Sequence, residues 1–217
     1  MLLALDTATR VASLALHDGR RVRYEATWEA GRQQTVQLTP RLVAALESLG
    51  LDVEGLSGVA VALGPGSFTG LRVGMAVAKG LALARNIPLL GVPTLDVMAV
   101  AQGRDRRPLV TVLEAGRGRI CAAIYRWRKG WQRREGPFLT TWEDLAAGVE
   151  KPTLFCGEVD KEGVETLERL GEMAVLLPPA CRLRRAGFLA ELAWERIRQG
   201  QADDPATLVP LYLHQPA

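Results

Sequence analysis

The sequence has few residues of the kinds that bind metals or form disulfides. Histidine occurs only at His17 and His214, and neither has a partner at the spacing of metal ligands. Cysteine occurs three times, at positions 121, 156 and 181, an odd number at wide spacing. That pattern matches neither a disulfide framework nor a zinc site. We therefore expect no bound metal, and we expect the two thiols in apolar stretches, at 121 and 156, to be buried.

Long hydrophobic runs are also missing. Arginine, lysine or glycine interrupts the longest apolar stretches well before the roughly 20 residues of a membrane-spanning helix. Residues 1–6 contain no basic leader and reach an acid too early for a signal peptide. With 48% hydrophobic and 24% charged residues, the composition is that of an ordinary globular protein. We expect a cytoplasmic protein without a membrane partner.

Positive charge is small in sum but uneven in position. The net charge is +3, arginine far outnumbers lysine, and basic clusters lie at 104–107, 126–134 and 182–185. Trp127 and Trp131 lie within the second cluster, so this stretch could contact RNA through charge and stacking. A solvated strand face with a hairpin turn is the interpretation we favour, because so small a net charge does not require a nucleic-acid partner.

The order of the predicted elements occurs twice along the chain. Hydrophobic periodicity predicts three strands, a helix, a strand, a helix, a strand and a helix in each half. In the first half they span 2–6, 11–17, 21–27, 34–49, 58–63, 68–85, 87–92 and 94–102. In the second half they span 109–113, 119–127, 131–135, 141–147, 153–156, 161–170, 174–177 and 186–200. This duplicated βββαβαβα order is typical of the α/β actin-like ATPase (ASKHA, ribonuclease-H-like) fold, with subdomains expected over residues 1–103 and 104–217.

A glycine-rich turn before the helix at 68–85 is the most specific motif of the chain. Its residues are Gly64, Pro65, Gly66, Ser67, Phe68, Thr69, Gly70 and Arg72, and the run ends at Gly74. A glycine-rich turn at a helix N-terminus can bind phosphate, but the Gly-Lys-Ser/Thr of a phosphate-binding loop is missing here. The residues favour the alternative, a tight turn capped by Ser67 and a helix whose glycines allow close packing.

The chain closely resembles the TsaB family, formerly called YeaZ, in three segments. They are the run at 64–74, the N-terminal Leu3-Ala4-Leu5-Asp6-Thr7-Ala8 and the C-terminal Pro210-Leu211-Tyr212-Leu213. The resemblance implies the same fold, with the last helix (about 186–200) and the tail packing on the first half. It also implies a non-catalytic subunit of the bacterial complex with TsaD and the ATPase TsaE. In that complex TsaD transfers threonylcarbamoyl from threonylcarbamoyl-AMP to adenosine 37 of tRNA, which the subunit contacts through the complex.

The resemblance also implies where partners bind, because TsaB proteins pair through their first two long helices. They pair with TsaD or, when alone, with a second copy as a homodimer. The helices at 34–49 and 68–85 are apolar on more than one side, which suggests a partner surface, although a thicker core would explain the same pattern. The residues expected at the partner surface are Leu38, Leu42, Ala45, Leu49, Leu71, Gly74, Met75 and Ala78.

The first hairpin, Asp6-Thr7-Ala8-Thr9-Arg10, resembles a weakened nucleotide site. Actin-like enzymes hold phosphates in a hairpin of the type Asp-x-Gly-Thr, where the carboxylate can bind a magnesium-bound water. Here Ala8 replaces the glycine that lets a phosphate approach the backbone. We expect Asp6, Thr7 and Thr9 to be a vestigial site in a chain without a cofactor, and an ATP or ADP site shared with a partner stays open.

Three other functions stay open. A metallopeptidase would need histidines, yet the region that matches the His-x-x-x-His pair of TsaD, residues 32–37, has none. Even the His-Ser usual in TsaB is replaced here by Gln34-Thr35. A sugar-type kinase or other ATP-dependent enzyme would need an intact phosphate hairpin. A direct tRNA-binding module would use the basic hairpins.

Overall fold

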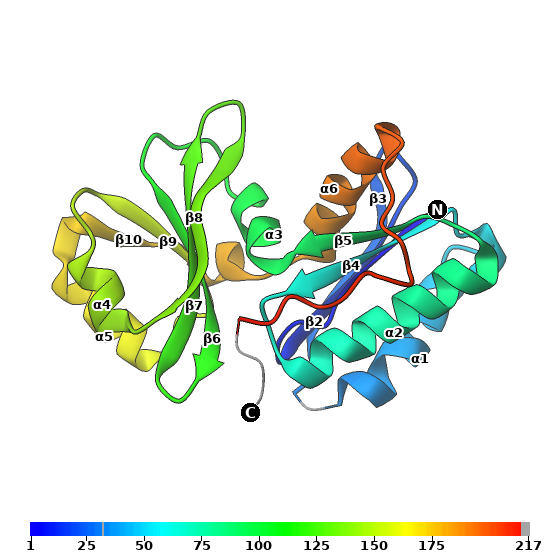
Figure 1. Cartoon of the computed structure of the whole chain (residues 1–217), viewed down its shortest axis with the longest axis horizontal. Helices are drawn as coiled ribbons and strands as arrows, with labels where there is room; N and C mark the ends of the chain where they lie inside the picture. The colour runs from blue at the N-terminus through cyan, green and yellow to red at the C-terminus, as the bar shows by residue number, and fades with distance from the viewer. Residues whose placement is uncertain (32, 214–217) are drawn as a thin grey trace. The chain divides into compact units, whose positions relative to one another are not determined.

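A computed structural model describes residues 1–31 and 33–213 and divides the chain into two compact units, each with one five-stranded sheet. The first unit comprises Met1–Val97 and Arg184–Tyr212, and the second consists mainly of Met98–Leu183. The chain therefore leaves the first unit and returns to it, as the colours of Figure 1 show.

The first sheet has the strand order β3-β2-β1-β4-β5. Its strands are β1 (Leu2–Asp6), β2 (Val11–His17), β3 (Val22–Glu29), β4 (Gly58–Gly64) and β5 (Leu89–Pro93). The central strand β1 pairs antiparallel with β2 and parallel with β4. The carboxyl end of β1 thus meets the turns that follow β1 and β4, which brings the first hairpin close to the glycine-rich turn.

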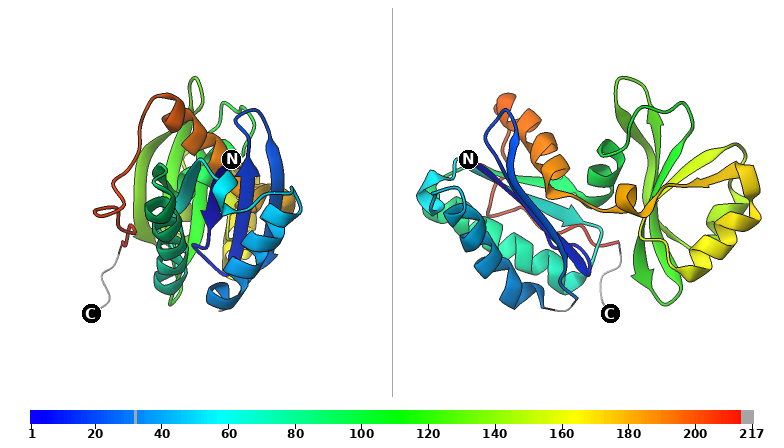
Figure 2. Two further views of the ribbon diagram at one scale, coloured as in Figure 1. Left: turned by 90° about the vertical axis from the view of Figure 1, so that its right-hand side faces the viewer. Right: turned by 180° about the vertical axis from the view of Figure 1, so that it is seen from behind.

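Helices cover both faces of this sheet (Figure 2). Helices α1 (Gln34–Glu47) and α2 (Phe68–Arg85) lie on one face, and α6 (Ala186–Arg198) lies on the other. Side chains alternate along a strand, so Leu3 and Leu5 pack with α1 and α2 while Leu2 packs with α6. Both faces of β1 are buried, which explains why the strand is apolar at every position before Asp6.

The second sheet has the order β10-β9-β6-β7-β8. Its strands are β6 (Leu109–Gly116), β7 (Arg119–Trp127), β8 (Trp131–Thr140), β9 (Thr153–Gly157) and β10 (Ala174–Leu176). Its helices are α3 (Thr94–Val100), which spans the boundary between the units, α4 (Trp142–Ala147) and α5 (Lys161–Arg169). Trp142 and Phe155 are the largest buried side chains of the core that α4 and α5 form with this sheet.

The observed elements follow the expected order in both halves, with short additions. Strand β8 extends to Thr140, past Pro137, whereas the sequence predicts an end at 135. Proline lacks an amide proton and is tolerated because β8 is the edge strand of its sheet. A one-turn 3₁₀ helix at Val53–Gly55, capped by Asp52, has no counterpart in the prediction.

Candidate functional site

The first hairpin follows β1 and is built around a buried carboxylate. Asp6 Oδ1 accepts a hydrogen bond of 2.9 Å from the Ala8 amide, which closes the turn. Asp6 Oδ2 accepts a hydrogen bond of 3.0 Å from Arg184 Nε. Both oxygens of the carboxylate therefore bond to the protein itself.

Arg184 comes from the segment just before α6 and is only 3% exposed. Besides Asp6, its guanidinium donates to Thr9 Oγ1 at 2.5 Å and to the carbonyl of Val11 at 2.8 Å. A buried ion pair is stable only when its remaining polar atoms are bonded, and this arrangement supplies those bonds. The arginine thus places a fixed positive charge beside the carboxylate that, in actin-like enzymes, can bind a magnesium-bound water.

The glycine-rich turn packs directly on the same hairpin. The Ser67 amide donates to the Ala8 carbonyl at 2.6 Å, and Thr7 Oγ1 donates to the Gly70 carbonyl at 2.7 Å. A Cβ at Gly66 would collide with the backbone of Ala8, and one at Gly70 would collide with the carbonyl of Thr7. These glycines are required because two backbone segments touch, as the close-packing interpretation predicts.

Three amides in the turn and the first turn of α2 donate to groups of the protein itself. Ser67 caps the helix as predicted, since its hydroxyl accepts from the Gly70 amide at 3.3 Å. The Gly64 amide donates to the Thr94 hydroxyl at 3.0 Å. With the Ser67 amide bonded to Ala8 as well, the turn offers little to a phosphate, and its geometry favours the structural interpretation over the anion site.

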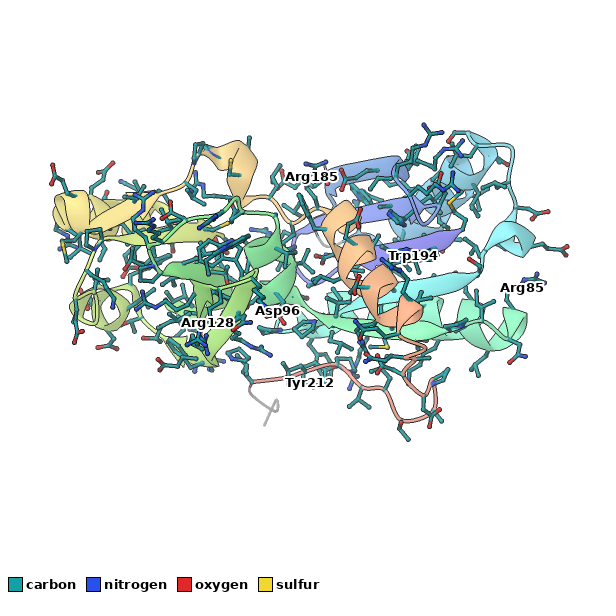
Figure 3. All side chains as sticks on the ribbon, turned by 90° about the horizontal axis from the view of Figure 1, so that it is seen from above. Arg85, Asp96, Arg128, Arg185, Trp194 and Tyr212 are labelled. Atoms are coloured by element: carbon teal, nitrogen blue, oxygen red, sulfur yellow. The ribbon has the colours of Figure 1, made fainter. Side chains whose placement is uncertain are left out.

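The C-terminal segment after α6 covers the outer side of the turn. The Leu211 amide donates to the Leu63 carbonyl at 2.7 Å, and Gly64, with φ of 108°, leaves room for that backbone. Tyr212, labelled in Figure 3, packs its ring 5.2 Å from that of Phe68 and accepts a hydrogen bond of 3.2 Å from Arg72 Nε. The guanidinium of Arg72 also lies 3.7 Å above the Phe68 ring. The turn and the C-terminal Leu-Tyr therefore form one structural cluster.

Gln34 stands where the family that the sequence resembles usually has a histidine, and its side chain hydrogen-bonds to the hairpin. Its side-chain amide is buried and donates to the carbonyls of Thr9 and Gly31, at 3.0 and 2.9 Å. Thr35 is exposed. The glutamine thus connects the first turn of α1 to the end of the hairpin.

The expectation that eight apolar residues of α1 and α2 face a partner is wrong for seven of them in the isolated chain. Only Leu49 is half-buried. The other residues are buried within the first unit: Leu38, Leu42, Ala45, Leu71, Gly74, Met75 and Ala78. Their row faces the sheet and supplies its core, so the accessible surface of the two helices is formed by other side chains.

The accessible surface of α1 and α2 is itself rich in apolar and small residues. Val36 and Val43 of α1 are 67% and 44% exposed, and Leu83 of α2 is 68% exposed. Gly80 is also exposed, and a Cβ built there would meet nothing within 4 Å among the described residues. We call these four residues the outer face of α1 and α2.

Metal and thiol chemistry find little support in the residues that the structure describes. Among them there is no group of three or more His, Cys, Asp and Glu side chains placed to hold a metal ion. His17 is buried, accepts from the Gly19 amide at 3.0 Å and lies 3.2 Å from Glu191, while His214 lies outside the described residues. Burial raises the pKa of both Cys121 and Cys156 to about 12, so these thiols stay protonated and unreactive at neutral pH.

Across residues 1–31 and 33–213, each helix is too short or too polar to cross a bilayer.

Arg184 is the site residue that sequence reasoning misses. It lies in a basic run that reads as a solvated loop, and its partner Asp6 is 178 positions away. No local periodicity links them. The only signal is that an acid ending a buried strand needs a cation or several donors to be stable there.

Comparison with known proteins identifies related families and structures with the same fold. The family model described as "TsaD: tRNA N6-adenosine threonylcarbamoyltransferase" matches residues 28–134. The "tRNA threonylcarbamoyladenosine biosynthesis protein TsaB" of Bacillus subtilis is 30% identical, over 98% of this chain and 93% of the relative. "YeaZ from Pseudomonas aeruginosa" superposes with a TM-score of 0.81 at 26% identity, covering 98% of this chain and 99% of that structure. The ethanolamine utilization protein EutJ from Carboxydothermus hydrogenoformans shares the fold alone, with a TM-score of 0.52 at 17% identity over 87% and 88% of the two chains. The expected actin-like fold is thus confirmed.

Proposed function

The chain belongs to the TsaB family, and we propose that it is a non-catalytic partner subunit in the biosynthesis of threonylcarbamoyladenosine in tRNA. Its partner is TsaD, which carries the transfer of the threonylcarbamoyl group to adenosine 37, and TsaE completes the complex. When TsaD is absent, the same helices pair two copies of the chain.

The absence of catalysis is supported by the state of the first hairpin. Actin-like enzymes use a carboxylate here to position a magnesium-bound water near the phosphates. In this chain the carboxylate of Asp6 is held by Arg184 and by the Ala8 amide. A fixed guanidinium repels a magnesium ion, and the hairpin backbone is in direct contact with Ser67 and Gly70.

The partner role is carried by the outer face of α1 and α2. A glycine inside a helix costs about 1 kcal/mol relative to alanine, so its presence needs a reason. Gly70 and Gly74 have one in the contact with Thr7, but Gly80 has no neighbour that a Cβ would meet among the described residues. A second helix that approaches closely at Gly80 would supply the reason and would bury the exposed Leu83, three positions along the same helix.

A complementation experiment tests this proposal. The tagged chain is expressed in a bacterium depleted of its own TsaB, and threonylcarbamoyladenosine in tRNA is measured by mass spectrometry together with the recovery of TsaD. We expect the wild type to restore the nucleoside and to recover TsaD. The variant Val43→Glu/Leu83→Glu places two charges on the outer face, and we expect TsaD recovery to fall by about tenfold or more.

Leu183→Glu is the matched control, because Leu183 is 43% exposed, close to the 44% of Val43, and lies in the second unit. It should behave as the wild type. The proposal fails if the double variant is folded, recovers TsaD normally and restores the nucleoside. ATP turnover by the purified chain that disappears in Asp6→Ala would contradict the non-catalytic role.

A further inference from the structure

Basic residues are unevenly distributed along the chain and are concentrated in the second unit. Residues 98–140 contain ten Lys or Arg and three Asp or Glu, although the whole chain has 27 basic and 24 acidic residues. The rest of the chain is therefore net acidic. A basic segment on a nearly balanced protein has a local potential that the net charge of +3 does not reveal.

The fold places part of this charge at one end of the second unit, while Arg117 and Arg119 lie at the opposite end of β7. Trp131 Nε1, at the start of β8, donates to the Gln102 carbonyl at 3.1 Å, which places the segment at 103–107 beside the β7–β8 hairpin. Figures 1 and 2 show the two loops at the same end of the sheet, and Figure 3 labels Arg128 in the hairpin. We call this set the basic hairpin surface; it consists of Arg104, Arg106, Trp127, Arg128, Lys129, Trp131 and Arg133.

The acid of the segment at 103–107 is paired with a neighbouring arginine. Asp105 forms a two-point ion pair with Arg107, at 3.0 and 2.7 Å, and the hydrogen bonds from Arg107 lower the pKa of Asp105 to about 2. In residues 98–183, which the structure describes without a gap, no carboxylate oxygen lies within 4 Å of Arg104, Arg106, Arg128 or Lys129. These four cations are therefore available to an external anion.

Two indoles lie among the cations. Trp127 and Trp131 face each other across the β7–β8 ladder, with ring centroids 5.5 Å apart and planes at 85°. Arg133 lies two positions after Trp131 on β8, opposite Tyr125 of β7. Because side chains alternate along a strand, Arg133 lies on the same face of the sheet as the indoles. Both indoles are only half-buried, which leaves ring surface for an unpaired base to stack on.

We infer that the basic hairpin surface contacts the backbone and an unstacked base of the tRNA substrate. The inference rests on the proposed function only for the identity of the RNA. Guanidinium groups suit phosphate oxygens, and half-exposed indoles beside them suit nucleobases. The combination of both groups on one strand face is what favours RNA.

The experiment titrates a fluorescent anticodon stem-loop RNA with the purified full-length chain, alone and with TsaD, at several salt concentrations. We expect Arg128→Glu/Lys129→Glu to weaken binding at least about tenfold and to reduce the slope of log affinity against log salt by about 1.5, as expected for two lost phosphate contacts. Trp127→Ala should weaken binding about fivefold with an unchanged salt slope, because stacking releases no counterions.

Arg20→Glu/Lys161→Glu is the control, since it makes the same charge change at two exposed positions outside the surface, and it should bind as the wild type. The inference is overturned if the wild type binds no RNA in either form. It is equally overturned if the hairpin variants bind RNA normally, or if they lose only the recovery of a protein partner. Recovery of TsaD is measured separately. If the chain does not bind TsaD, the proposed function fails, but the RNA titration still decides whether this surface binds RNA.

Discussion

At the scale of single residues, the ion pair between Arg184 and Asp6 is the interaction on which the first hairpin most depends. It joins positions far apart in the sequence, both partners are buried, and each also bonds to backbone or hydroxyl groups. Such a pair adds modest stability while it is complete, because desolvation offsets the attraction. Its loss on one side is costly, because a buried charge then has no partner.

Arg184→Met should therefore lower the free energy of unfolding by about 3 to 5 kcal/mol, measured by urea denaturation. Asp6→Asn/Arg184→Met removes both charges and should recover part of that loss. Arg185→Met, at the next position, is the control: its ion pair with Glu25 is half-exposed, so we expect a change within about 1 kcal/mol. A single Arg184→Met variant as stable as the wild type would show that the guanidinium does not neutralise Asp6.

At the scale of elements, α2 has two kinds of glycine that the sequence alone does not separate. Gly74 faces the hairpin, where a Cβ would collide with Thr7 Oγ1, while Gly80 faces outward with nothing within 4 Å in the described part of the chain. The helix therefore divides its small residues between an internal contact and an accessible face.

Replacing either glycine by leucine should therefore change the stability of the protein in opposite directions. Gly74→Leu should lower the free energy of unfolding by about 3 kcal/mol or more, because the side chain is forced into the hairpin. Gly80→Leu should raise it by up to about 1 kcal/mol, because leucine is the better helix former. Thermal unfolding checks both. Recovery of TsaD should fail for a folded Gly80→Leu protein, and normal recovery would contradict close approach of a partner helix.

The sequence predicts the elements well because periodicity and caps are local signals. Helix α2 begins and ends at the predicted residues, and Ser67 caps it as predicted. The side of α1 that faces the sheet is not a local signal, since the rows of Leu38 and Leu42 and of Val36 and Val43 are both apolar. Burial selects the leucine row. The partners of Arg184 and Gln34 depend on the tertiary fold, so no pattern along the chain predicts them.

At the scale of the whole chain, the C-terminal segment completes the first unit by binding the edge strand β5. Asp203 anchors it: its amide donates to the Leu89 carbonyl at 2.8 Å, and its carboxylate accepts from the Gly91 amide at 2.7 Å and from Arg196 at 2.8 Å. Burial acts to raise the pKa of Asp203, but the bonds from Arg196 and Gly91 outweigh it and hold the pKa below the ordinary 3.8.

A lowered pKa in the folded state means that this anchor stabilises the protein fully above pH 3.8 and loses its effect as the pH falls through the lower value. Asp203→Asn should therefore lower the free energy of unfolding at pH 7 by about 1 kcal/mol, a modest value because solvent reaches the pair. The difference from the wild type should shrink toward pH 2. Urea unfolding at both pH values checks this, with Glu195→Gln on the surface of α6 as the control. A difference that does not change with pH would exclude the carboxylate as the cause.

The return of the chain to its first unit also sets an order of events during synthesis. The face of the first sheet that carries Leu2 and Ala4 is covered by α6, which begins at Ala186, so the ribosome must translate the whole second unit before that face can be closed. At about 5 to 20 residues per second, the nascent first sheet exposes an apolar face for some 5 to 20 seconds. The second unit can fold in that interval, whereas the first must wait until α6 has been translated.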